Sequence, residues 1–405
     1  MNDTISRNQA IQRLLRLARL PEAVCISPHE AVGLVASHNI CAFCHVPEQA
    51  CSVRDGYALR TEDIEKSAAT KPVTLTVMQT IRAESTSSTP VGPGEAARVL
   101  TGGLVPDGAD AVLAEEDVEI DGNTILVRTP VQSGWFIRPA GGEMEQGAII
   151  TQAGTTITPQ AAAIMIRTRI NSIHVHPKPM ARVIAVGSEL SDPCCGDECD
   201  TARFPADNLV LAKGLLELSG AIVTETGVLP DNEATLIETL SSDTLPDILI
   251  TTGGTGRSER DFARSSAQQA GFTTLFNSVD IRPGRNMFAA QKGKTLLFGL
   301  PGPPAAVFAC FHAIILPIIH RLRGLPHQDQ PTMARFEDGF SVRPGGEWLV
   351  LCSFEHRGTT LTATPYIGKD VPPMLAMSLA HGLAVIPGGD AILPGGEAEI
   401  ISTIF

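Results

Sequence analysis

The chain has 405 residues, which exceeds the usual size of one hydrophobic core, so two or more domains are expected. Its formal net charge is −13 at pH 7 and its isoelectric point is near 5.2. This balance argues against a general nucleic-acid binder, because contacts to backbone phosphates need clustered Lys and Arg. An anionic substrate must therefore meet a local basic site.

Residues 1–20 interleave apolar residues with Arg7, Arg13, Arg16 and Arg19. The pattern predicts an amphipathic helix that packs against a neighbouring domain, and a helix on a membrane surface is the alternative. The segment lacks the apolar core of a signal peptide, and no later stretch supplies the ~18 uninterrupted apolar residues of a transmembrane helix. We therefore expect a cytoplasmic protein with neither membrane nor nucleic-acid partners.

The next segment mixes helical and β-like patterns. Ser27-Pro28-His29-Glu30 supplies a Ser N-cap, Pro at the first helical position and Glu at the third, which predicts a helix to about Ser37. Asp121-Gly122 predicts a hairpin over residues 118–127. Other expected elements are strands at 73–78, 97–100 and 111–114 and a helix at 159–170.

These patterns divide the first part of the chain. We interpret residues 47–146 as a β-rich insertion domain within a helical linker domain made of residues 1–46 and 147–179. One continuous α+β domain is the alternative.

From residue 182 short apolar runs alternate with helical segments, as is typical of a parallel sheet covered by helices on both faces. The expected strands are 182–186, 222–226, 247–251 and 294–298, and the expected helices are 208–218, 231–240 and 304–323, the last bent at Pro317. Strands at 349–355 and 360–364 follow, with Pro-Gly-Gly turns. The predicted fold class is multidomain α/β, with an α/β domain at 180–325 and a C-terminal β domain at 332–405.

The cysteines form two clusters. Cys41, Cys44 and Cys51 accompany His45, and a second group comprises Cys194, Cys195 and Cys199. Nine cysteines, an odd number, without a secretion signal predict free thiols rather than a disulfide framework. A metal site in either cluster is the alternative.

A glycine-rich run, T-T-G-G-T-G at 251–256, follows the third apolar strand and leads to Asp261. In a parallel sheet the carboxyl ends of the strands form the ligand crevice, and glycines there let backbone amides approach an anion closely. For a glycine run alone a purely structural turn is the alternative. The glycine-rich run, together with Leu229-Pro230-Asp231 and Gly299-Leu300-Pro301-Gly302, resembles the molybdopterin-binding fold of molybdopterin adenylyltransferases and molybdenumtransferases. The resemblance extends over roughly 180–324.

Further motifs resemble the molybdenumtransferase branch in particular. They are D-G-Y-A at 55–58, T-G-G at 101–103 followed by V-P-D-G-A-D-A-V at 105–112, and I-R through G-G-E at 137–143. The resemblance therefore covers nearly the whole chain. It implies an α/β/α sandwich like that of the adenylyltransferases, and a homodimer in which this domain faces the insertion of the other subunit.

The resemblance implies insertion of molybdate-derived molybdenum into adenylylated molybdopterin with release of AMP. It implies catalytic roles for Asp55, Asp231, Asp261 and Glu189, with Glu189 and Asp261 holding Mg²⁺. The implied substrate-binding residues are Thr101, Arg138, Glu143, Gly253, Gly254, Thr255, Arg282 and Arg285. A molybdopterin adenylyltransferase and molybdoenzyme apoproteins are further implied partners.

Some of these residues have simpler interpretations. Asp231 is also a good helix N-cap, Glu189 fits a solvated surface position, and Arg282 and Arg285 fit a surface turn. The resemblance places the two arginines at the lysine positions of the family's K-P-G-K segment, where their guanidinium forks would bind molybdate.

The sequence also departs from the family pattern near the implied site, at Gly256, Ser278, Pro303, Lys369, Arg54 and Ala306. A catalytically weak paralogue that binds molybdopterin as a chaperone, delivery or regulatory protein is therefore the alternative function. Adenylyl transfer from ATP is a third, suggested by the T-T-G-G-T-G form. The sequence leaves open whether molybdate or tungstate is used and which apoenzyme is served.

Overall fold

A computed structural model describes residues 4–193, 203–255, 262–326, 330–367 and 371–403. Their contacts divide the chain into two compact units. Unit 1 comprises Met1–Val24 with His176–Phe405, and unit 2 is Cys25–Val175. The boundaries expected for four domains stay a prediction.

Unit 1 contains the predicted parallel sheet. The strand order is β18-β15-β19-β24-β23-β20, and the first four strands run parallel. The expectation of a parallel-rich α/β fold is confirmed, and two antiparallel strands at one edge add to it. The strands are β15 (Met180–Val186), β18 (Ile222–Leu229), β19 (Ile248–Thr252), β20 (Thr273–Phe276), β23 (Phe288–Lys292) and β24 (Thr295–Leu300).

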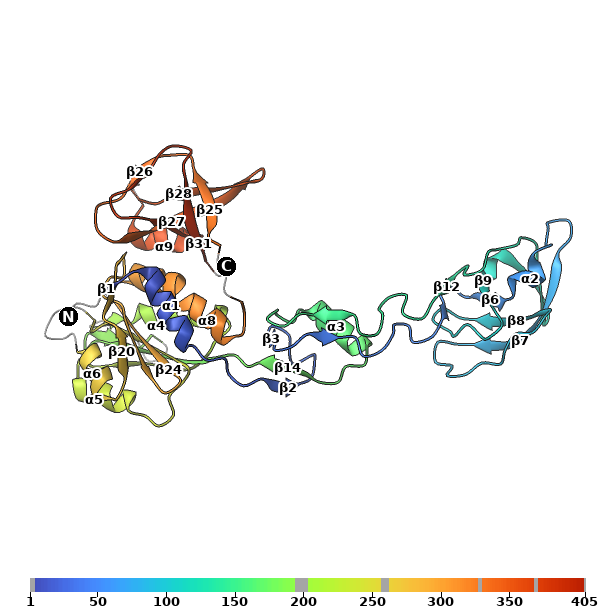
Figure 1. Cartoon of the computed structure of the whole chain (residues 1–405), viewed down its shortest axis with the longest axis horizontal. Coiled ribbons are helices and arrows are strands. Elements are labelled where there is room, and N and C mark those ends of the chain that lie inside the picture. The colour runs from blue at the N-terminus through green and yellow to red at the C-terminus, as the bar shows by residue number, and fades with distance from the viewer. Residues whose placement is uncertain (1–3, 194–202, 256–261, 327–329, 368–370, 404–405) are drawn as a thin grey trace. The chain divides into compact units, whose positions relative to one another are not determined.

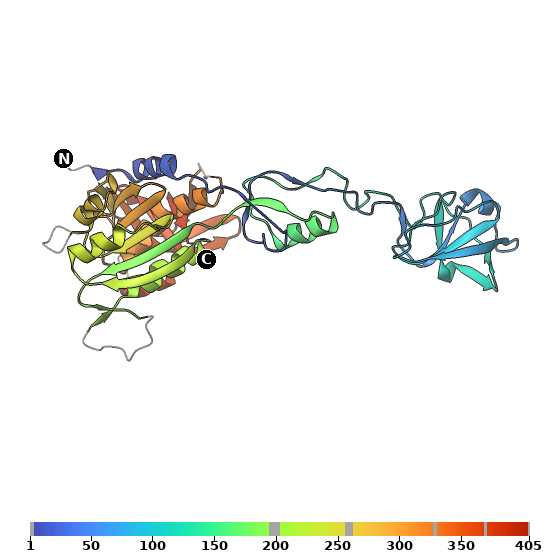
Figure 2. The same cartoon turned by 90° about the horizontal axis from the view of Figure 1, so that it is seen from below.

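Helices cover both faces of this sheet (Figures 1 and 2). Val183 and Ile250 point into one core, and their neighbours Ile184 and Leu249 point into the other, because side chains alternate along a strand. The first core receives α1 (Arg7–Leu17), α4 (Asp207–Leu218), α7 (Pro304–Cys310) and α8 (Leu316–Leu322), and the second receives α5 (Glu233–Leu240) and α6 (Ala263–Gln269).

The helix expected at 304–323 is interrupted just before Pro317, where a bend was predicted. A π-helical turn, η2 (Phe311–Ile315), separates α7 from α8, and Pro317 lies in the first turn of α8. Proline has no N–H to donate to the preceding turn, so widening of the helix just before it accommodates the missing bond. Pro304–Leu322 is long and apolar enough to cross a membrane by length and composition, but 78% of its most apolar window is buried inside the protein.

The C-terminal part of unit 1 is the expected β structure. Its strands follow the order β22-β27-β28-β25-β31-β29, and an additional pairing of β27 with β29 closes five of them into a barrel. Buried Arg7 of α1 ties to this barrel, since its Nε lies 2.6 Å from Glu347 and its Nη2 2.9 Å from Glu399. The elements are β22 (Ile281–Arg282), β25 (Thr332–Phe336), β26 (Phe340–Ser341), β27 (Glu347–Arg357), β28 (Thr360–Pro365), α9 (Pro373–Leu379), β29 (Gly382–Ile386), β30 (Ala391–Ile392) and β31 (Glu397–Ser402).

Unit 2 contains a six-stranded sheet of order β10-β11-β7-β8-β6-β9 (Figure 1). The predicted hairpin is confirmed, because Asp121 faces Thr124 across a two-residue turn. The strands are β6 (Gly56–Leu59), β7 (Val73–Ile81), β8 (Glu95–Val99), β9 (Ala111–Ala114), β10 (Val118–Asp121) and β11 (Thr124–Val127), with α2 (Thr61–Ile64) and η1 (Glu115–Asp117) between them.

The prediction of a helix after Ser27 is wrong. Residues 28–34 form turns that lead into the short strand β3 (Val35–Ala36). Gly33 has φ +84°, a left-handed value that ends any right-handed helix, although Ser27 still hydrogen-bonds Glu30 as a capping pair would. The predicted helix at 159–170 is confirmed as α3 (Pro159–Arg167).

The remaining strands are short and pair in sheets of two or three strands. They are β1 (Thr4–Ile5), β2 (Val24–Ile26), β4 (Ile40–Cys41), β5 (Cys51–Ser52), β12 (Ile137–Arg138), β13 (Ile149–Thr151), β14 (Ile173–His176), β16 (Leu190–Ser191), β17 (Phe204–Pro205) and β21 (Ser278–Val279).

Candidate functional site

The loops that follow four parallel strands meet at the carboxyl edge of the sheet, as parallel topology requires. The loop after β15 is joined to the loop after β18 by a reciprocal pair of hydrogen bonds. Ser188 N donates to Asp231 Oδ2 over 3.2 Å, and Asp231 N donates to Ser188 Oγ over 2.8 Å. Two of the predicted acidic loops therefore form one polar edge.

Asp231 does not serve as a helix cap. The N-cap of α5 is Asn232, whose side chain accepts from Thr235 N over 3.2 Å. The N-cap alternative for Asp231 is thus wrong, because the neighbouring residue performs that task. One carboxylate oxygen of Asp231, Oδ2, accepts the hydrogen bond from the Ser188 amide.

The glycine loop after β19 packs backbone against backbone. Gly253 has φ +88°, its N–H donates to Leu300 O over 3.1 Å, and a Cβ there would lie 2.4 Å from Val186 O. Gly254 also has a left-handed φ of +62°. Thr255 is buried and its hydroxyl lies 3.4 Å from Leu300 O, so in this structure that hydroxyl secures the loop.

Glu189 lies on this edge at a surface position, which its simpler interpretation as a solvated residue also predicts. The residue is exposed, and a Cβ placed on Gly187 would lie 2.9 Å from Glu189 Oε1. Its carboxylate therefore folds over the loop backbone. The predicted partner Asp261 and the divergent Gly256 lie outside the described residues. Across the described ranges no group of three or more His, Cys, Asp and Glu side chains is arranged as a metal site.

The two arginines differ in their surroundings. Both side chains are exposed, and Arg282 Nε donates to Gly345 O over 2.9 Å, which ties its guanidinium to the C-terminal barrel. Between them, Gly284 has φ +110°, and a Cβ there would lie 2.4 Å from Cys310 Sγ. Burial raises the pKa of the Cys310 thiol to about 12, so this cysteine acts as a neutral packing group beneath the turn.

The other divergent positions have structural partners. Ser278 Oγ lies 2.6 Å from Thr4 Oγ1 where β21 pairs with β1. Pro303 is the N-cap of α7 and Ala306 is buried in it. Lys369 lies outside the described residues.

In unit 2 the predicted polar residues gather around β5. Asp55 accepts from Thr101 N over 2.6 Å and from Thr101 Oγ1 over 2.7 Å, and these two hydrogen bonds lower the pKa of Asp55. The hydroxyl of Thr101 therefore donates its proton in a hydrogen bond to Asp55. Gly102 N donates to Ser52 O over 2.8 Å, so the Thr101 loop is held on β5.

The second predicted pair lies on the strand beside it. Arg138 of β12 pairs with Cys51 of β5 in register, and its guanidinium forms an ion pair with Glu143. Arg54 pairs with Glu116 at 2.7 Å and lies 5.1 Å from the centre of the Phe136 ring. This divergent arginine therefore stays on the surface of unit 2.

Comparison with known proteins decides the family. The profile described as "MoeA N-terminal region (domain I and II)" matches residues 5–168, and the profile "Probable molybdopterin binding domain" matches residues 182–321. The chain belongs to the MoeA family. It is 27% identical over 390 residues to the molybdopterin molybdenumtransferase of Bacillus subtilis, covering 94% of this chain and 90% of that protein.

Other relatives of this MoeA-family chain agree. It is 28% identical over 300 residues to the molybdopterin molybdenumtransferase of a Nostoc strain, covering 73% of this chain and 68% of that protein. A crystal structure described as a molybdopterin biosynthesis MoeA protein from Pyrococcus horikosii matches with a TM-score of 0.85 and 24% identity, covering 99% of both chains. This likeness supports the fold.

Sequence reasoning missed two residues at the carboxyl edge. Ser188 bridges to Asp231, and buried Asn208 at the start of α4 donates from Nδ2 to Gly302 O over 2.6 Å. Asn208 thus holds the loop after β24. Neither residue carries a charge or breaks a periodic pattern, so its position next to the motifs was the only signal available.

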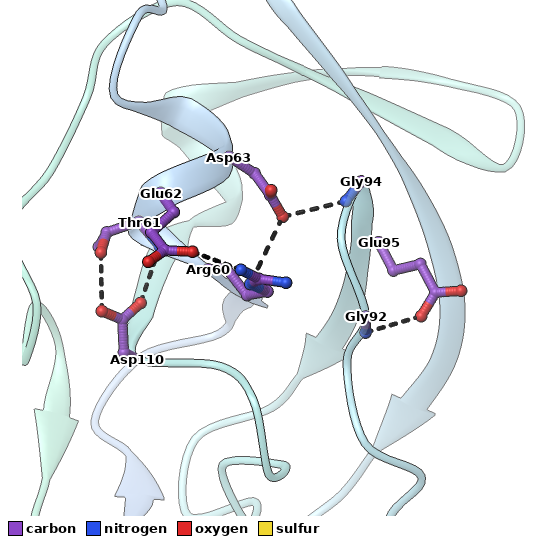
Figure 3. A network of polar contacts seen from close by, with 8 residues as sticks. All are labelled: Arg60, Thr61, Glu62, Asp63, Gly92, Gly94, Glu95 and Asp110. Carbon is purple, nitrogen blue, oxygen red and sulfur yellow. Dashed lines mark hydrogen bonds and ion pairs between the residues drawn. The ribbon is translucent and has the colours of Figure 1, made fainter.

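Asp110 in the second motif has a structural task in this MoeA-family chain. Its carboxylate accepts from Thr61 N and from Thr61 Oγ1, each over 2.7 Å, at the start of α2 (Figure 3). Burial raises the pKa of Asp110 and the hydrogen bonds from Thr61 lower it, with a net shift downward. Nearby, Asp63 accepts from Gly94 N over 3.0 Å, which fastens the same helix to the sheet.

The first cysteine cluster does not converge on an ion. Cys41 is exposed, Cys44 Sγ donates to Thr168 O over 3.5 Å, and Cys51 is buried. His45 Nδ1 accepts from Gln146 N over 3.1 Å. Within the described ranges Cys25, Cys41, Cys44, Cys51 and Cys310 carry free thiols, in agreement with the expectation from the sequence. Cys194, Cys195 and Cys199 lie outside those ranges.

Proposed function

We propose that this chain inserts molybdate-derived molybdenum into adenylylated molybdopterin and releases AMP. Membership of the MoeA family and the named molybdopterin molybdenumtransferase relatives support this activity over a purely binding paralogue. The observation that carries the proposal is the edge where Ser188, Asp231 and Gly253 are hydrogen-bonded at the carboxyl ends of parallel strands. Ligands of doubly wound sheets bind at this edge.

The pterin nucleotide would lie along the three loops. Asp231 offers a carboxylate oxygen to N–H donors of the substrate, and the left-handed glycines at 253 and 254 keep side chains out of its path. Thr255 supports this loop from beneath through its contact with Leu300 O. Binding therefore uses backbone geometry that the sheet fixes in advance.

A divalent cation, Mg²⁺, would neutralise the phosphoryl oxygens of the anhydride when bound. The exposed Glu189 carboxylate is a hard donor at this edge, and Mg²⁺ needs few protein carboxylates when substrate phosphates complete its shell. The donor chemistry therefore fits the ion. Asp261, which follows the same loop in sequence, would supply the further carboxylate.

Molybdate, a dianionic substrate, would be held by Arg282 and Arg285. Their exposed guanidinium groups present planar forks that suit tetrahedral oxyanions, and Arg282 is already oriented by Gly345 O. An acidic chain of net charge −13 needs such a local basic site to attract the ion.

We further propose a cytoplasmic homodimer in which the Asp55–Thr101 and Arg138–Glu143 pairs of one subunit complete the site of the other. Each pair holds a carboxylate by hydrogen bonding on unit 2. A molybdopterin adenylyltransferase would supply the substrate, and molybdoenzyme apoproteins would accept the product.

The test is AMP release from adenylylated molybdopterin with and without molybdate. The proposal expects release that depends on molybdate and on Mg²⁺. Tight pterin binding without AMP release would favour the binding paralogue, and formation of adenylylated pterin from ATP would favour an adenylyltransferase.

A further inference from the structure

Two hollows lie along helix α1, and no loop of the carboxyl edge lines either of them. The first has a volume of about 460 Å³ and is lined by Thr4, Ile5, Gln9, Gln12, Arg13 and Arg16. The second has a volume of about 360 Å³ and is lined by Arg16, Leu17, Arg19, Thr273, Gln291 and Gly293. Arg16 borders both hollows, and we call the two neighbouring hollows together the α1 groove.

The α1 groove is basic on a strongly acidic chain. Arg13, Arg16 and Arg19 follow one another at intervals of three residues, so they are neighbours along the helix and its exit. Arg13 donates to Leu275 O and so covers the edge strand β20. Arg16 and Arg19 are exposed, and within the described ranges neither has a carboxylate within ion-pair distance.

Simpler roles for these arginines account for only part of the groove. Arg16 stabilises the carboxyl end of the α1 dipole, but Arg19 lies beyond the C-cap Ala18. A membrane-surface role for the helix requires a free apolar face. Ala10, Ile11 and Leu14 are buried in the protein, so that face is already occupied.

We propose that the α1 groove docks an extended acidic segment of a partner protein. Arg16 and Arg19 border its second hollow and offer one charge each to successive carboxylates of an extended segment, whereas a compact anion would fill only one of the two hollows. Gln9, Gln12 and Gln291 line the walls and can hydrogen-bond the backbone of such a segment. The net charge of −13 repels an acidic partner elsewhere, so the groove also orients its approach.

The probe is a fluorescein-labelled deca-glutamate peptide, which stays extended at neutral pH because its charges repel. Its binding to the full chain is measured by fluorescence anisotropy at low ionic strength. The double variant Arg16→Gln/Arg19→Gln should weaken binding about tenfold, since each exposed charge pair contributes a few-fold in affinity. The double variant Lys178→Gln/Lys213→Gln removes the same charge elsewhere on unit 1 and should leave binding within about twofold of wild type.

Thermal melts of both double variants establish that they fold. If the arginine pair proves unstable, Arg19→Gln alone, outside α1, serves in its place. Absence of peptide binding by the wild type, or equal weakening by the two double variants, would overturn the proposal. It would also be overturned if tripolyphosphate or phosphatidylserine vesicles bound with the same arginine dependence while the peptide did not.

Discussion

Replacing Gly253 by Ala tests whether the glycine loop maintains the carboxyl edge. Gly253 has φ +88°, and a Cβ there would lie 2.4 Å from Val186 O, which belongs to strand β15. The left-handed backbone costs an L-residue about 1–2 kcal/mol. The clash forces β15 and the loop apart, so the total destabilisation should be about 2–4 kcal/mol.

At about 2–4 °C for each kcal/mol in a unit of this size, the melting temperature should fall by about 4–16 °C. Differential scanning calorimetry measures this change, and AMP release should fall with it. Gly302→Ala is the matched control, because this neighbouring loop glycine has nothing within 4 Å of an added Cβ. If Gly253→Ala melted and turned over like Gly302→Ala, the role assigned to the close approach at Val186 would be refuted.

Four further predictions concern the residues of the proposed site. Asp55→Asn should flatten the pH dependence of the melting temperature. A carboxyl whose folded pKa is lowered stabilises the folded state above its unfolded pKa of about 3.9, and this contribution is lost as pH falls through the folded pKa. A wild-type pH profile in the variant would contradict the Thr101 hydrogen bonds. Asp261→Asn should abolish Mg²⁺-dependent AMP release while pterin binding and the melt are kept, as equilibrium titration and calorimetry would record, and persistent release at the wild-type rate would remove the metal assignment. Arg285→Lys should raise the molybdate requirement by roughly ten- to a hundredfold, because one charge-assisted fork bond contributes ~1.5–3 kcal/mol, and unchanged molybdate titrations would remove the pocket assignment. Mixed dimers of Asp55→Ala and Asp261→Ala subunits should regain activity, and intact dimers without recovery would exclude a shared site.

The α/β core was predictable because its signals are local. Short strand-like runs that alternate with helical segments predict β15, β18, β19 and β24, and alternate residues of β15 and β19 enter the two cores. The antiparallel strands β20 and β23 escaped prediction because their polar residues hide the apolar period. The helix predicted after Ser27 does not form, although Ser27 and Glu30 make the hydrogen bond of a capping pair, because Gly33 adopts a left-handed backbone conformation.

The candidate site was predictable only where motifs name residues. Gly253 and Asp231 lie at the edge that parallel topology requires, whereas the bridge from Ser188 and the support from Asn208 depend on tertiary contacts between distant loops. Likewise, the sequence predicted Thr101 as a substrate donor, but in the fold its hydroxyl donates to Asp55, which lies 46 residues earlier in the chain. Such pairings arise from folding, so spacing along the chain does not encode them.

The measurement that tests the proposed activity most directly is a joint titration with molybdate, in which AMP release and pterin-bound molybdenum are quantified in the same reaction. We expect both to rise together with molybdate and in equal molar amounts. AMP release without molybdenum incorporation, or a wild-type response that stays flat as molybdate increases, would contradict the account.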